Sequence, residues 1–141
     1  TMPQVAFPSS QKTIRMQKHH TTVFYRIALG VVFCSTSFLA LTGKNIPVAK
    51  DINDKINHIA AFYTLALLTD FSWPTSGFRA PKVLALLGYG LAIEIVQYFL
   101  PHRSFSLFDL GADAVGMLLY LISVPLLKRI YPLSLRFAPG E

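Results

Sequence analysis

Residues 83–100 read VLALLGYGLAIEIVQYFL, and this apolar stretch decides the fold class because a helix of that length can cross a bilayer. Glu94 is its only charged residue. An ionisable side chain inside a membrane span is costly and marks a candidate functional site. We therefore expect the rest of the chain to supply partners for Glu94.

The composition agrees with a membrane protein. Hydrophobic residues make up 52% of the chain, charged residues 14% and aromatic residues 13%, and the mean hydropathy is +0.46. The 141 residues hold one domain of about four spans at roughly 20 residues each. Glycine and proline separate four apolar segments: residues 24–41, 56–73, 83–100 and 107–127. We predict an all-α integral membrane bundle of four transmembrane helices.

The positions of lysine and arginine predict the orientation, because cytoplasmic loops carry an excess of them. With the N-terminus inside, the cytoplasmic set is Lys12, Arg15, Lys18, Arg26, Arg79, Lys82, Lys128, Arg129 and Arg136, and the outer set is Lys44, Lys50, Lys55 and Arg103. Both termini are therefore expected in the cytoplasm. Residues 1–22 are predicted as a basic, non-helical cytoplasmic tail, 23–127 as the four-helix domain and 128–141 as a second cytoplasmic tail.

Two features exclude other classes or carry little information. The net charge of +6 comes from residues between the hydrophobic runs and not from one basic, aromatic-rich face, so nucleic acid is not an expected partner. Cys34 is the only cysteine, and its apolar surroundings in the sequence predict a buried structural thiol.

The predicted topology brings three helix ends to the outer level of the membrane. They are the start of the second span, the end of the third and the start of the fourth. The polar residues at these ends are Asp54, Lys55, His58, Glu94, Gln97, Arg103, Asp109 and Asp113. Helical spacing places those of each segment on one stripe. The cytoplasmic ends show no comparable cluster, and Asp70 near the inner end of the second span is expected to pair with a base such as Arg79.

Several of these residues also form motifs. The patterns Asp54-Lys55-x-x-His58, Glu94-x-x-Gln97, Pro101-x-Arg103 and Asp109-x-x-x-Asp113-x-x-Gly116 together resemble the VanZ family of small multi-pass membrane proteins. The resemblance covers residues 54–127, and family members often carry asparagine at the position of Asp113. It implies the fold, a site at these residues and a location in the bacterial inner membrane. The family name comes from an association with teicoplanin resistance, which implies a role in the cell envelope and no particular reaction.

The charges of the cluster do not balance. Four carboxylates face two permanent cations, Lys55 and Arg103, so the acids cannot all be ionised and unpaired at low dielectric. Ser106 is expected to cap the fourth helix, whose positive end favours Asp109 and Asp113. Glu94 would depend on Arg103, Lys55, His58 or protonation of its own carboxyl group.

Three functions remain open. In the first, the eight polar residues bind the head group of an envelope lipid or glycolipid. In the second, they form an internal network, and the protein is a structural or assembly subunit beside a membrane protein partner. In the third, His58 and a carboxylate, Glu94 or Asp109, act as general base and acid.

No cofactor is predicted. His58, Glu94, Asp109 and Asp113 form a mixture of donors that could hold a divalent cation. Their spacing matches no metal motif, so we do not expect a metal.

Overall fold

The computed structural model describes residues 8–42, 50–101 and 103–130, with the backbone alone for residues 8–18 and 50–53. Within these ranges the chain forms four helices and no strand. They are α1 (Pro8–Leu41), α2 (Lys50–Ser72), α3 (Ala80–Tyr98) and α4 (Leu107–Leu127). The predicted all-α class is confirmed. Residues 1–7 and 131–141 of the two predicted tails lie outside the described part.

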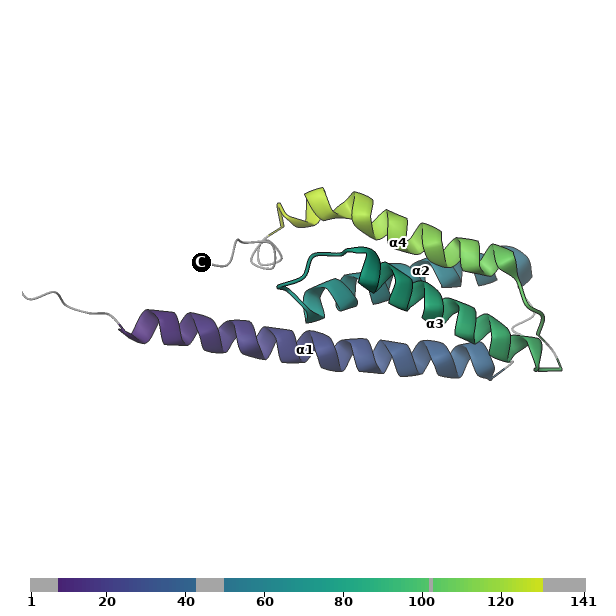
Figure 1. The fold of residues 1–141 in the computed structure, drawn as a ribbon, viewed down its shortest axis with the longest axis horizontal. Helices are drawn as coiled ribbons and strands as arrows, with labels where there is room; N and C mark the ends of the chain where they lie inside the picture. Colours follow the sequence, from purple (N-terminus) through teal and green to yellow (C-terminus); the bar gives the residue numbers. More distant parts are fainter. Residues whose placement is uncertain (1–7, 43–49, 102, 131–141) are drawn as a thin grey trace, which may run out of the picture.

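The helix bounds agree best with prediction at α4, which begins and ends where the apolar segment does. Ser106 caps it as expected, since its side chain accepts a hydrogen bond from the backbone N–H of Asp109 at 3.3 Å. The prediction of a non-helical segment before residue 23 is wrong, because α1 already begins at Pro8. Proline is favoured at a first helical position, where its missing N–H has no intrahelical acceptor. Figure 1 shows the start of α1 projecting beyond the other helices.

Three of the four helices are long and apolar enough to cross a membrane: residues His19–Leu41 of α1, and the whole of α3 and α4. α2 does not meet that standard, although we expected it to span. Its sequence contains the charged residues Lys50, Asp51, Asp54, Lys55 and Asp70. Length and composition therefore support three spans directly.

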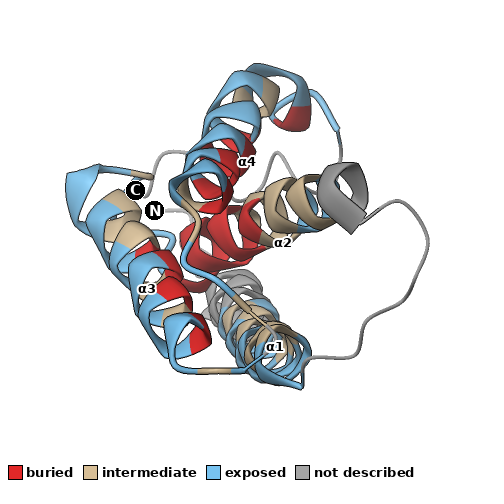
Figure 2. Cartoon of the chain, turned by 90° about the vertical axis from the view of Figure 1, so that its right-hand side faces the viewer, coloured by how far each residue is buried: buried red, intermediate tan, exposed pale blue. Residues whose placement is uncertain are grey.

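The core is built mainly from α2 and α4. Figure 2 shows the buried positions of these two helices facing each other, with α1 and α3 beside them. The buried apolar cluster consists of Phe62, Leu65, Ala66, Leu86, Met117, Tyr120 and Leu127. α2 is thus packed against protein along much of its length, and this explains how it tolerates a less apolar sequence.

Gly116 sets the distance between α2 and α4. A Cβ atom at this position would lie 2.5 Å from the carbonyl oxygen of Ile59 and 2.9 Å from the backbone nitrogen of Tyr63. Both are backbone atoms of α2 and cannot move without moving the helix. Close approach of this kind at small residues is common in membrane bundles.

The outer surface is strongly apolar. Phe24, Phe38 and Leu39 on α1 are exposed, as are Leu84 on α3 and Ile122 on α4. Large apolar side chains exposed on several helices are what contact with lipid requires. Cys34 also lies on the exposed surface of α1, so the prediction of a buried thiol is wrong.

Candidate functional site

The polar residues predicted for one level of the membrane lie at one end of the bundle. In Figure 1 this is the right-hand end, where α2 begins, α3 ends and α4 begins. Some of these residues contact one another through their side chains, and others contact the backbone of a neighbouring segment.

His58 and Asp113 connect α2 to α4. The Nδ1 atom of His58 lies 2.8 Å from Oδ1 of Asp113, whose side chain is completely buried. The partner of His58 is therefore Asp113 and not Asp54, its neighbour one turn away on α2. The second oxygen of Asp113 has no hydrogen-bond partner among the described residues. It lies against Gly90 of α3, where any Cβ atom would collide with it.

Glu94 connects α3 to the start of α4. Its Oε2 accepts a hydrogen bond of 2.8 Å from the backbone N–H of Ser106, the residue that caps α4. Its side chain is fully buried, and Oε1 has no hydrogen-bond partner among the described residues. The hydrogen bond to Glu94 thus comes from a backbone N–H, a partner that was not among those expected from the sequence.

Arg103 pairs with Asp54 and not with Glu94. Its Nη1 lies 3.6 Å from Oδ2 of Asp54, and both side chains are partly exposed. One ligand atom from each of Asp54, His58 and Asp109 lies within 4.8 Å of the others. This triad differs from the mixture considered from the sequence, since it includes Asp54 and leaves out Glu94 and Asp113.

Gln97 faces a different helix. Its Nε2 donates a hydrogen bond of 3.1 Å to the carbonyl oxygen of Ala40 near the end of α1. Lys55 lies beside Asp54 in the same turn of α2 and is partly exposed.

The cluster has two layers. The buried layer contains Glu94, Gln97, Asp109 and Asp113, and the partly exposed layer contains Asp54, Lys55, His58 and Arg103. Acceptor oxygens dominate the buried layer, while the partly exposed layer combines one carboxylate with two cations and the imidazole of His58. A molecule approaching from outside the bundle therefore meets the second layer first.

The opposite end of the bundle carries a second polar cluster, so the expectation of no comparable group there is wrong. Asp70 is buried, and its Oδ1 lies 3.0 Å from Nζ of Lys82, while its Oδ2 accepts a hydrogen bond of 2.6 Å from Tyr120. Lys82 therefore takes the place predicted for Arg79. The sequence held a usable signal, because Lys82 follows Pro81 at the start of α3, on the predicted level of Asp70.

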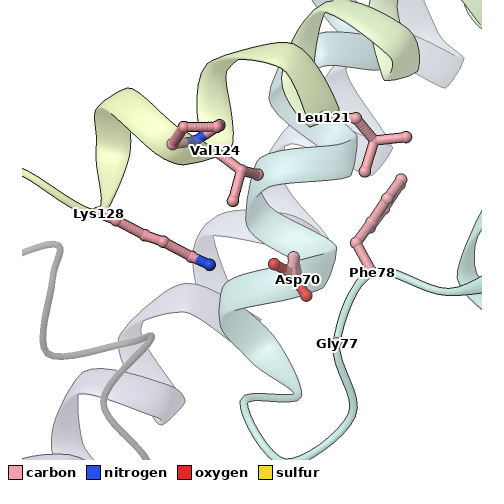
Figure 3. Close-up of a pocket in the computed structure, with 7 residues that line it drawn as sticks. Asp70, Gly77, Phe78, Leu121, Val124 and Lys128 are labelled. Carbon is pink, nitrogen blue, oxygen red and sulfur yellow. The ribbon is translucent and has the colours of Figure 1, made fainter.

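A pocket of about 320 Å³ adjoins Asp70. Figure 3 shows Lys128, which directly follows α4, directed towards Asp70, with Phe78, Leu121 and Val124 nearby. The two ends of the bundle thus differ in charge. One combines several acids with few cations, and the other has a single buried acid close to two lysines.

Comparison with protein families matches residues 2–128 to the family described as VanZ/LLP1. The chain belongs to the VanZ/LLP1 family. The resemblance found in the motifs is confirmed, and the match extends through α1, which those motifs do not cover. The acidic end of this VanZ/LLP1 chain coincides with the residues that carry the motifs.

Among curated proteins, an uncharacterized protein of Schizosaccharomyces pombe is 39% identical to this VanZ/LLP1 chain over 74 residues. These are 50% of the chain and 46% of the relative, so the chain spans about half the length of the curated relative that it matches. The relative is eukaryotic, and the family is therefore not exclusively bacterial. No solved structure matches the chain.

Proposed function

We propose that this VanZ/LLP1 membrane protein binds the polar head group of a lipid or glycolipid at its acidic end. The observation that carries the proposal is the surplus of acceptors there. Glu94 and Asp113 are fully buried, and each leaves one carboxylate oxygen without a hydrogen-bond partner among the described residues. Burying such atoms costs free energy unless a donor reaches them. Hydroxyl and amine groups of a head group are donors of this kind.

The partly exposed layer would make the first contacts. Asp54 and His58 offer acceptors to hydroxyl or amine groups, while Arg103 and Lys55 suit a phosphate. The buried layer would orient these side chains, as Asp113 does for His58 through the bond at 2.8 Å. The ligand class is therefore a head group that combines donors with a negative charge.

The proposal includes α2 as a fourth span. α2 packs against the other helices, and its buried residues face protein, so its charged residue Asp70 does not have to meet lipid. With both termini in the cytoplasm, the acidic end lies at the outer face. The same site chemistry applies in the bacterial inner membrane and in a eukaryotic membrane, so the proposal does not depend on which membrane holds the chain.

Mass spectrometry of the lipids that copurify with the protein tests this function. We expect one lipid class to be enriched with wild type and lost from Arg103→Ala, since the guanidinium would hold the head-group phosphate. Arg79→Ala is the matched control, because Arg79 is exposed at the opposite end of the bundle. Identical lipid profiles from wild type and both variants would remove the proposal.

A structural role is the second candidate, and the contacts between helices favour it. His58 ties α2 to α4, Gln97 ties α3 to α1, and Glu94 ties α3 to the start of α4. A bundle fixed in this way could serve as a subunit of a larger membrane complex. In that case His58→Ala would lower the stability of the bundle and leave the profile of copurified lipids unchanged.

The geometry supports acid and base catalysis less well than it supports binding. His58 and Glu94, the residues proposed for it, are bonded to Asp113 and to the Ser106 backbone, and not to each other. Binding therefore takes precedence over catalysis in the proposal.

A further inference from the structure

The triad of Asp54, His58 and Asp109 has the donor types of a divalent metal site. One atom from each residue lies within 4.8 Å of the others, and the three come from two helices that are packed together. Imidazole nitrogen suits Zn²⁺ and other transition metals, and carboxylate oxygen suits Mn²⁺ as well. In a tetrahedral zinc site with bonds of about 2.1 Å, ligand atoms lie roughly 3.4 Å apart. Rotation of the partly exposed side chains of Asp54 and His58 can shorten the distances between ligand atoms to this value.

His58 is oriented for this role by Asp113. Its Nδ1 lies 2.8 Å from Oδ1 of Asp113. When Nδ1 carries the proton and donates it to this carboxylate, Nε2 presents a lone pair on the other side of the ring. Metal-binding histidines almost always donate their second ring N–H in this way, which fixes the tautomer and the ring orientation.

The buried carboxylates give an independent reason to expect a cation. Asp113 touches the His58 ring, is completely buried and leaves Oδ2 without a hydrogen-bond partner among the described residues. Glu94 is also completely buried. Its Oε2 is bonded to Ser106 at the start of α4, and its Oε1 has no hydrogen-bond partner among the described residues. A divalent cation beside these groups would offset their combined negative charge.

Arg103 does not occupy the triad. Its Nη1 lies 3.6 Å from Oδ2 of Asp54, longer than an ordinary hydrogen bond, so this contact does not use up the lone pairs that the carboxylate offers to an ion. The side chains of Asp54 and His58 keep 35% and 15% of their surface exposed. An ion can therefore reach the triad from outside the bundle, while the buried layer lies behind it.

We propose that Asp54, His58 and Asp109 bind one divalent transition-metal ion, with Zn²⁺ or Mn²⁺ as the best-matched ions, and that Asp113 positions His58. This site goes beyond the binding of a head group and does not depend on it. It replaces the expectation, drawn from sequence spacing, that the protein holds no metal.

Metal content of the purified protein tests the site. The full chain is purified in detergent, stripped with EDTA, incubated with Zn²⁺ or Mn²⁺, separated from free ions and analysed by mass spectrometry for the metal. We expect about one ion per wild-type chain, and at least a tenfold weaker affinity for His58→Gln and Asp109→Asn. Asp113→Asn should weaken the affinity about 10- to 100-fold, as is typical when a group that orients a metal-binding histidine is replaced.

Two further variants separate metal binding from effects on folding. Asp54→Asn changes a partly exposed side chain, so this variant should fold and still lose the ion. Arg103→Gln should keep the ion, because removing a competing cation frees both oxygens of Asp54. Asp70→Asn, which removes the buried acid at the opposite end, should keep it as well. Gel filtration of every variant checks that the chain is folded.

The result that overturns the site is a folded wild-type protein that takes up no ion, or equal metal content in wild type and folded Asp54→Asn. Lipids are measured on the same preparations. Wild-type protein that takes up an ion but enriches no lipid class contradicts only the head-group proposal, and wild-type protein that enriches a lipid class but takes up no ion contradicts only the metal site.

Discussion

At the residue scale, two buried aspartates dominate the molecule, and their surroundings differ. Asp70 receives a lysine ammonium at 3.0 Å and a tyrosine hydroxyl at 2.6 Å. Asp113 receives one histidine nitrogen at 2.8 Å and keeps a second oxygen without a hydrogen-bond partner in the described part of the chain. The first arrangement is that of a structural tie. The second leaves binding capacity unused.

Replacing Tyr120 tests the tie at Asp70. Tyr120→Phe removes a buried hydrogen bond to a charged group, and we expect unfolding in mixed detergent micelles to show a loss of about 1.5–3 kcal/mol. Tyr63→Phe is the matched control, because the Tyr63 hydroxyl bonds the neutral hydroxyl of Ser123 at 3.0 Å in a partly buried position. Its loss should be about 0.5–1.5 kcal/mol. Equal losses in the two variants would contradict the special role of Asp70.

Replacing His58 tests the pair with Asp113. His58→Ala leaves a completely buried carboxylate without this partner, so we expect a loss of about 3–5 kcal/mol in the same unfolding measurement. His58→Gln keeps a donor and should lose less. His20→Ala, at an exposed position on α1, should have no measurable effect. A stable His58→Ala protein would show that Asp113 finds another partner or is neutral.

The residues of the candidate site could be predicted where a charged residue interrupts an apolar segment of the sequence. Glu94 and Asp113 stand out in this way, and helical spacing with the order of the spans brought them to one end. The individual contacts were not predictable. A backbone N–H, such as that of Ser106 bonded to Glu94, leaves no mark in the sequence. The contacts of Lys82 and Tyr120 with Asp70 were not predicted, because a lysine at a helix start and a tyrosine in an apolar helix are both common.

At the element scale, the contact between α2 and α4 controls the packing, and glycine allows it. Gly116→Ala would push a methyl group against backbone atoms of α2, so we expect a loss of about 1–3 kcal/mol of stability, measured by unfolding in mixed micelles. Gly111→Ala is the control in the same helix. Gly111 is exposed with no atom within 4 Å of an added Cβ, so helix propensity should make this variant neutral or more stable by about 0.5–1 kcal/mol. A neutral Gly116→Ala would show that the two helices can separate without cost.

Helix ends were predictable where a local signal marks them. Ser106 marks the start of α4, and the apolar run ends with the helix at Leu127. The start of α1 was not predictable from hydropathy, because a helix that continues beyond the membrane becomes polar and loses the apolar signal. α2 starts earlier than its apolar segment for the same reason.

At the scale of the whole molecule, the sequence predicts an all-helical membrane bundle, and the helices and the family match agree with it. The position of α2 could not be read from hydropathy. Its role follows from tertiary packing, since its buried apolar residues Phe62, Leu65 and Ala66 pack against the other helices. Hydropathy alone does not show whether a helix is surrounded by lipid or by other helices, and α2 is largely surrounded by the rest of the chain.

Labelling of single cysteines tests whether α2 crosses the membrane. In a Cys34→Ser background, Thr42→Cys, Thr75→Cys and Ser104→Cys place thiols at exposed positions that flank α2 and α3. A membrane-impermeant maleimide added outside intact cells should label positions 42 and 104, and position 75 only after permeabilisation. Labelling of positions 42 and 75 from the same side would show that α2 does not cross.

Cys34 gives the native chain a ready attachment point. It is the only cysteine in the sequence. It is exposed on α1, among the exposed apolar residues that would contact lipid. A spin label or fluorophore attached to this thiol would report its depth in the bilayer through quenching by lipid-bound probes. The wild-type protein can therefore be positioned in a membrane by spectroscopy without a single substitution.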